Sequence, residues 1–172
     1  LDVGGMEETL SLFNEVEFCL KITATSKKIV WTPFATLLQH GPGSVIRHRH
    51  KPLDNQYVEQ EVRLLQKRWM PQLREDPAYH PHLCLQGPEW QPETHIAVPW
   101  DTHFQDRPRV VAFPYDTWGC GEYRVRAPLR ALHRVGLIEY ALMPNDKEGR
   151  VPTPTELARM QPDTVLLQNT LQ

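Results

Sequence analysis

The sequence contains little cysteine and no excess of charge of either sign. Its three cysteines stand far apart and form no CxxC pair, which excludes a disulfide framework or a zinc ribbon and fits a reducing compartment. Nineteen basic residues face 21 acidic ones, so the surplus of cations that general nucleic-acid binding needs is missing. No apolar run approaches the roughly 18 residues of a membrane-spanning helix. We therefore expect a cytoplasmic protein, or one peripheral to the inner membrane.

Familiar catalytic motifs are also missing, whereas proline is abundant. We find no Walker loop, no HExxH, no nucleophile elbow and no paired Cys–His site. The 16 prolines all lie at or after Pro33, and nine of them lie between Pro71 and Pro128. Because proline interrupts regular structure, this density predicts a linker over residues 91–107, between one domain at 1–90 and another at 108–172.

The first part of the chain predicts two helices and a strand. Residues 14–24 read as a helix with Asn14 as N-cap and with Val16 and Leu20 on its inner face. Residues 28–32 are rich in β-branched and aromatic side chains and predict a strand. Residues 56–73 predict a longer helix, ended or kinked by Pro71. Its apolar stripe consists of Val58, Val62, Leu65, Trp69 and Leu73.

The second part predicts strands at residues 109–113, 137–143 and 163–167. A helix is expected at 123–135, and a capping box that starts at Thr153 opens another. The alternation of strand and helix indicates an α/β fold, with the β-α-β-α-β opening of a doubly wound parallel sheet. Three strands make only half of such a sheet.

Few residues point to chemistry by position alone. Glu15 and Glu17 open the first helix, where the dipole favours an ionised carboxylate, but ordinary first-turn acids fit the same pattern. His40 precedes a Gly-Pro-Gly loop and fits a metal or phosphate contact, or a solvated loop histidine. Gly119 and Gly121 lie between a strand and a helix, where backbone N–H groups can hold a phosphate or a sugar, and Arg124 follows them.

Several stretches taken together resemble the C-terminal half of a bacterial family 2 glycosyltransferase domain of GT-A fold. They are Gly4-Gly5-Met6-Glu7-Glu8, Asn14-Glu15-Val16-Glu17-Phe18-Cys19-Leu20, Val30-Trp31-Thr32-Pro33-Phe34-Ala35, His40, and the stretch from Arg68-Trp69 to Leu83. Residues 109–132, with Gly119-Cys120-Gly121-Glu122-Tyr123-Arg124, are similar to the start of a second, GT-B-like module with a Rossmann-like sheet. In large bacterial enzymes that build surface polysaccharide, such a module follows the first.

The resemblance implies an enzyme that transfers a sugar from a nucleotide-sugar donor to a hydroxyl of a glycan acceptor. Glu15 matches the position of the catalytic base, and His40 a position that contacts metal or diphosphate, with Mn²⁺ or Mg²⁺ as the cofactor. The remaining residues assigned to substrate binding are Glu17, Ser44, Arg47, Trp69, Gly119, Gly121 and Arg124.

The sequence also departs from the family pattern. Glu15 and Glu17 replace aspartates, and the loop after His40 keeps Ser44 but needs Arg47 to shift into the place of an arginine. The half that carries the nucleotide-binding strands and the DxD motif is not in these residues. We therefore expect the fragment alone to be inactive and to form a homo-oligomer or a domain swap. A non-catalytic scaffold and a stand-alone Rossmann-like nucleotide-binding protein are the alternatives.

Overall fold

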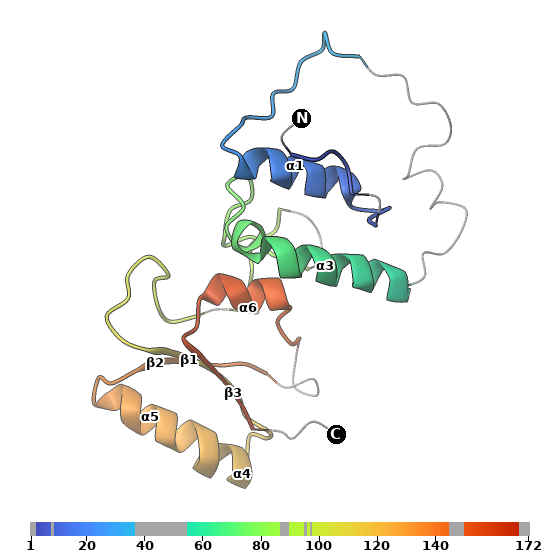
Figure 1. Cartoon of the computed structure of the whole chain (residues 1–172). Coiled ribbons are helices and arrows are strands. Elements are labelled where there is room, and N and C mark those ends of the chain that lie inside the picture. The colour runs from blue at the N-terminus through green and yellow to red at the C-terminus, as the bar shows by residue number, and fades with distance from the viewer. Residues whose placement is uncertain are drawn as a thin grey trace. The chain divides into compact units, whose positions relative to one another are not determined.

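The computed structural model describes residues 3–7, 9–36, 55–86, 90–94, 96, 98–144 and 150–168. The chain forms two compact units, Leu1–Gln72 and Leu73–Gln172. Figure 1 shows the helices of the first unit and the small sheet of the second. Within the described ranges, no helix has the length and apolar character needed to cross a membrane.

The first helix of unit 1 has the predicted span but not the predicted cap or inner face. Helix α1 covers Asn14–Ala24, and its N-cap is Phe13, whose side chain makes no capping bond. The buried residue of α1 is Glu17, whereas Val16 is exposed. The prediction that Asn14 caps the helix and that Val16 faces inward is therefore wrong. The reason is that Glu17 pairs with Arg68 of the later helix α3 (Asn55–Arg74), while Glu61 of α3 accepts N–H groups of the residues just before α1.

The strand predicted at residues 28–32 does not form. This segment is neither strand nor helix, and Trp31 is 86% exposed. An isolated extended segment is not stable without a neighbouring strand. The described part of unit 1 supplies no such neighbour, since all three strands of the sheet belong to unit 2.

The long amphipathic helix is confirmed. Helix α3 covers Asn55–Arg74, and its backbone leaves helical geometry at Trp69 (φ −124°, ψ 17°), two residues before Pro71. A proline ring clashes with the preceding turn and cannot donate the helical hydrogen bond, so the kink lies where it was expected. Leu65 is buried on the predicted stripe, and Glu61 is buried beside it.

Unit 2 contains a three-stranded parallel sheet, which confirms the α/β class. The strands are β1 (Arg109–Phe113), β2 (Glu139–Leu142) and β3 (Thr164–Leu167). Their order is β2-β1-β3, so the strand that comes first in sequence lies in the centre. Val111 stands opposite Ala141 on one side and opposite Val165 on the other. β2 and β3 are slightly shorter than the sequence predicted.

A different helix covers each face of the sheet. Val111 packs with Met160 of α6 (Pro154–Met160), whereas its neighbour Ala112 packs with Leu129 of α5 (Ala127–Arg134). Successive side chains of a strand point to opposite faces, so β1 contributes to both layers. In Figure 1, α5 and α6 lie on opposite sides of the strands.

The helix after β1 starts earlier than predicted. Gly119–Gly121 is not a loop but forms the first turn, α4, and the wider π-helical turn η1 (Glu122–Arg126) follows and leads into α5. Pro128 falls in the first turn of α5, where its missing N–H is tolerated. Gly136, at φ 76°, stops the helix as predicted. The capping box at Thr153 is confirmed, because its hydroxyl accepts from the N–H of Glu156.

The proline-rich segment, residues 91–107, belongs to compact unit 2. Ile96, Val98 and Trp100 pack on the sheet, and the Trp100 indole donates to the Met160 carbonyl (2.8 Å). Buried Arg109 donates to the carbonyls of Asp101 and Phe104 (2.8 Å each). The compact units divide after Gln72, and the assignment of residues 1–90 and 108–172 to two glycosyltransferase domains stays a prediction.

Candidate functional sites

Glu17 lies at the centre of a network of ion pairs in unit 1. Its carboxylate is 1% exposed and contacts Arg68 Nη1 (3.0 Å) through Oε1 and Lys21 Nζ (2.9 Å) through Oε2. Arg68 also contacts Glu7 (3.1 Å). Its hydrogen bonds to Glu7 and Glu17 raise the pKa of Arg68. Both oxygens of Glu17 are therefore held by cations, and its assignment to substrate binding stays a prediction.

Glu15 lies in the first turn of α1 and is exposed, so an incoming hydroxyl can reach its carboxylate. The start of this helix is held by Glu61 of α3. Glu61 accepts the N–H groups of Ser11 (2.9 Å), Leu12 (2.9 Å) and Phe13 (3.2 Å). Burial raises the pKa of Glu61, but these hydrogen bonds lower it by more, so the pKa lies below its ordinary value. Glu61 was missed in the sequence because an acid beside an apolar stripe carries no sign of its tertiary partners.

Trp69 lies at the kink of α3 and is half-buried. Its indole Nε1 is buried and has no hydrogen-bond partner among the described residues. The three assigned residues of unit 1 that the structure describes therefore differ in state: Glu15 is accessible, Glu17 is ion-paired, and Trp69 is packed at a bend.

The predicted metal and loop contacts lie outside the described residues. These are His40, Ser44 and Arg47. Where the chain is described, no three His, Cys, Asp or Glu side chains are grouped so as to hold a metal ion. The divalent metal stays a prediction that depends on His40, and we derive no step through it.

The turn at the carboxyl end of β1 contains the other assigned residues. Asp116 Oδ1 accepts the N–H groups of Trp118 (3.0 Å) and Gly121 (2.8 Å). A Cβ at Gly121 would overlap the Asp116 carbonyl oxygen, so only glycine allows this approach. Gly119 has open space around it, and Arg124 is exposed one turn later.

Gln168, which follows β3, ties this turn to the next strand. Its Oε1 accepts the N–H of Tyr115 (2.9 Å), and its Nε2 donates to the Cys120 carbonyl (2.9 Å). The ends of β1 and β3 and the start of α4 are thus fixed together. Glu15, Glu17 and Trp69 belong to unit 1, whereas Gly119, Gly121 and Arg124 belong to unit 2, and the two sets form separate candidate sites.

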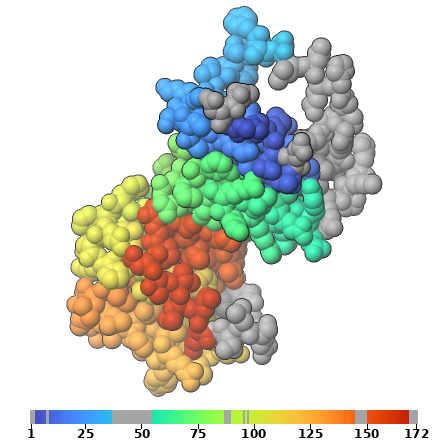
Figure 2. Space-filling model, viewed as in Figure 1, coloured from blue at the N-terminus to red at the C-terminus, as the bar shows by residue number. Residues whose placement is uncertain are grey.

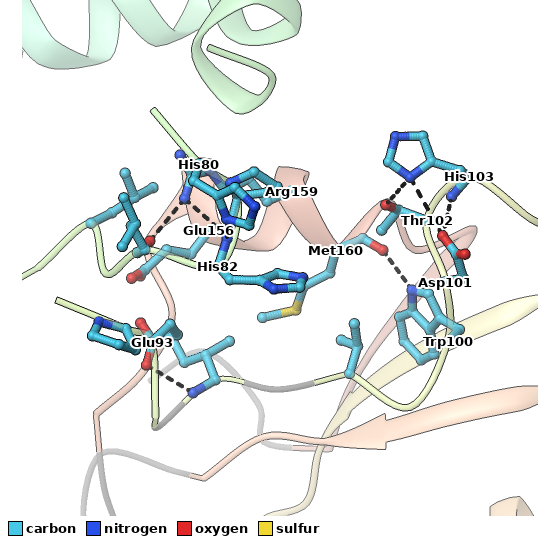
Figure 3. A pocket seen from close by; sticks show the side chains of 16 residues that line it. His80, His82, Glu93, Trp100, Asp101, Thr102, His103, Glu156, Arg159 and Met160 are labelled. Carbon is cyan, nitrogen blue, oxygen red and sulfur yellow. Dashed lines mark hydrogen bonds and ion pairs between the residues drawn. The ribbon is translucent and has the colours of Figure 1, made fainter. Parts of the chain in front are cut away.

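A third candidate, which the sequence did not reveal, is a pocket of about 930 Å³ in unit 2. It lies between the proline-rich segment and α6. Figure 3 shows His80, His82 and Arg159 on one side, Trp100 to His103 on the other, and Met160 between them. The histidines carry no ligand spacing in the sequence. Backbone hydrogen bonds fix the wall that holds His82: the Glu93 N–H donates to the His82 carbonyl (2.8 Å), and the Cys84 N–H donates to the Gln91 carbonyl (2.8 Å).

The carboxylates beside this pocket are already paired. Arg150 bridges Glu93 (2.8 Å) and Glu156 (2.8 Å), and Glu156 also serves the capping box of α6. Burial lowers the pKa of Arg150, but its hydrogen bonds and charge contact with Glu156 raise it by more. Arg159 donates to the Leu83 carbonyl (3.1 Å) and lies over the Tyr79 ring. These contacts fix the walls of the pocket.

Comparisons with known proteins give one informative match. No family model matches the chain, and no solved structure matches it. An uncharacterized protein, y4gI, of Sinorhizobium fredii is 35% identical over 86 residues, which are 49% of this chain. The match spans only 9% of the length of that relative. The relative is therefore a far longer protein, and its name states no activity.

Proposed function

We propose that this chain is part of a sugar-transferring enzyme, at the junction between a GT-A domain of family 2 and a GT-B-like module. The division into two compact units and the parallel β-α-β-α-β sheet of the second unit support this assignment. The length of the relative agrees with a large parent protein. The fragment by itself is expected to bind donor poorly and to transfer no sugar.

The observation that carries the proposal is the fixed turn at Asp116 and Gly121. In open parallel sheets, ligands bind outside the carboxyl ends of the strands, where neighbouring connections diverge. Here β1 leads toward β2 while β3 lies on its other side, so the turn stands at such a point. Gly121 lets the helix start approach the strand end closely, as a site for a sugar or nucleotide requires.

In unit 1, Glu15 is the proposed general base. It would take the proton from the acceptor hydroxyl as the oxygen attacks the anomeric carbon and the nucleoside diphosphate leaves. Its carboxylate is exposed in the first turn of α1, where an acceptor hydroxyl can reach it. A base at this step contributes roughly 10²- to 10⁴-fold in rate.

The test is sugar transfer by the natural protein that contains these residues. We expect Glu15→Gln to lower the rate about 10²-fold or more, because the amide cannot accept the proton. Glu59→Gln is the matched control, since Glu59 is exposed on α3 and pairs only with Arg63 among the contacts described for it. Wild-type transfer by Glu15→Gln would exclude Glu15 as the base.

A stand-alone nucleotide-binding protein is the second candidate, and the same turn favours it. Calorimetry with a UDP-sugar and Mn²⁺ on the 172-residue chain separates the two proposals. Binding that is lost in Gly119→Val but kept in Glu15→Gln supports the second candidate. Binding that is lost in His40→Ala supports the transferase, because His40 is the residue assigned to the metal and the diphosphate. A chain that binds nothing fits the inactive fragment, and the transfer assay above then decides against the scaffold.

A further inference from the structure

We propose that the pocket between the proline-rich segment and α6 binds a neutral sugar unit of a glycan. The inference rests on the proposed function for its substrate class, but it concerns a site to which no role was assigned. The pocket, at about 930 Å³, falls in the size range of small-molecule sites and would hold a short oligosaccharide.

The lining has the two kinds of surface that a pyranose ring requires. Apolar side chains, among them Ile96, Val98 and Met160, form a floor on which the C–H face of a sugar can pack. Imidazoles stand on both sides: His82 lies beside Met160, and His103 lies across from it with Thr102 (Figure 3). Imidazole and hydroxyl groups both donate and accept hydrogen bonds, as the hydroxyls of a sugar do.

The charged side chains of the pocket do not favour a nucleoside diphosphate as the ligand. Three carboxylates line it, on Asp101, Glu93 and Glu156, and Arg159 is the cation among the lining residues. Arg150 neutralises Glu93 and Glu156 from outside the lining. The two arginines do not exceed the three carboxylates, so the pocket offers a multiply charged anion no surplus of guanidinium groups. A neutral polyol needs no such surplus.

Two contacts hold the site in shape before a ligand arrives. The Trp100 indole is fixed to the Met160 carbonyl (2.8 Å), and Asp101 accepts the N–H of His103 (2.8 Å). This hydrogen bond lowers the pKa of Asp101. Its carboxylate is therefore ionised and can accept a hydrogen bond from a sugar hydroxyl. A preformed site loses less conformational freedom on binding.

The test is saturation-transfer NMR on the 172-residue chain with glucose, galactose, mannose and N-acetylglucosamine at millimolar concentration. We expect a saturation-transfer signal for at least one of these sugars, and we expect UDP not to displace that sugar. His82→Ala and His103→Ala should each bind the sugar about fivefold more weakly. Both histidines are exposed, so these variants keep the fold. His133→Ala, on α5 at the other face of the sheet, is the imidazole control and should bind as the wild type does.

The inference is wrong if none of the four sugars gives a saturation-transfer signal. It is also wrong if both pocket variants bind as tightly as the wild type, or if UDP displaces the sugar. The outcome is independent of the transferase assay, because binding is read without any donor. If the chain binds a sugar here and Glu15→Gln leaves the rate of sugar transfer unchanged, the pocket proposal stands and Glu15 is not the base. If no sugar binds here and Glu15→Gln lowers that rate, Glu15 stands as the base and the pocket proposal fails.

Discussion

The amide nitrogen of Gly121 lies 2.8 Å from Oδ1 of Asp116, and its Cα faces the carbonyl of the same residue without room for a methyl group. The side chain of Asp116 therefore accepts a hydrogen bond from the first turn of the helix, and its backbone carbonyl packs directly against Gly121 in the same turn. The two glycines of this turn are consequently not equivalent.

Gly121→Ala should destabilise unit 2 by about 1–3 kcal/mol, because the clash is with backbone and cannot be relieved by a side-chain rotation. Gly119→Ala is the matched control. Nothing lies within 4 Å of a Cβ there, so alanine should leave stability unchanged or raise it by up to about 1 kcal/mol. Urea unfolding of the two variants measures both effects, and equal midpoints would contradict the close approach.

Glu61→Gln should loosen the start of α1, because a neutral amide holds the N–H groups of Ser11, Leu12 and Phe13 less well than a carboxylate. We expect a loss of about 1–3 kcal/mol at pH 7. Glu59→Gln, at an exposed site on the same helix, should cost about 0.5 kcal/mol or less. Amide hydrogen exchange in residues 11–17 locates the effect.

The stabilisation by Glu61 should also depend on pH. The pKa of Glu61 is lowered in the folded protein from its ordinary 4.5, so its contribution is present above pH 4.5. It is lost as the pH falls through the lower, folded pKa. The difference in unfolding free energy between wild type and Glu61→Gln should therefore shrink below pH 4.5 and stay constant at higher pH. A difference that grows on acidification would contradict this assignment.

Arg68→Met should destabilise unit 1 by about 2 kcal/mol, because it leaves buried Glu17 with Lys21 alone. The cost should fall short of the 3–5 kcal/mol seen on breaking fully buried pairs, since Arg68 is partly exposed. Adding Glu17→Leu should recover part of the loss, and a double-mutant cycle measures the coupling. Arg63→Met, whose partner is exposed, should change stability by less than about 1 kcal/mol.

Self-association should occur through β3, with a second copy of this chain as the partner. Val165 and Leu167 share one face with Val111 and Phe113, and Leu166 shares the other with Ala112, yet all three are exposed. Figure 2 shows residues of this C-terminal segment at the surface. The edge carries no proline or charge that would block pairing, and two copies of one strand can pair antiparallel about a twofold axis.

Sedimentation velocity on the 172-residue chain tests this prediction. Leu167→Lys should shift a larger species toward the 20.0 kDa monomer, because it places a charge on the open edge. Val135→Lys changes an equally exposed residue on the other side of the sheet and should leave the distribution unchanged. A wild-type chain that sediments only as a monomer would contradict the prediction.

The parts of the fold that the sequence predicted are those that local chemistry decides. β1 lies over the predicted residues, and α6 begins at its capping box, because branched side chains and a Thr-Pro-Thr-Glu run act within a few positions. The kink before Pro71 is likewise a local steric effect. Each of these elements could be located without knowledge of its neighbours.

The predictions were wrong where the local structure depends on a partner that is distant in the sequence. Residues 28–32 have strand composition but no strand to pair with in the described part of unit 1. Asn14 was expected to cap α1, but the cap is Phe13, and Glu61, far away in sequence, accepts the N–H groups of the residues that lead into the helix. The candidate sites follow the same division: Gly119 and Gly121 mark a local turn, whereas His82 and His103 line one pocket from positions that are distant in the sequence.

Ile96, Val98 and Trp100 pack on the sheet, and this packing decides where a fragment that contains unit 2 can begin. A fragment that begins at Arg109 would lose Ile96, Val98 and Trp100, and would leave Val111, Met143 and Met160 open to water. The guanidinium of Arg109 would also lose the two carbonyl groups to which it donates hydrogen bonds. A fragment that begins at Leu73 keeps this cover, so its yield of folded, dispersible protein should exceed that of the shorter piece.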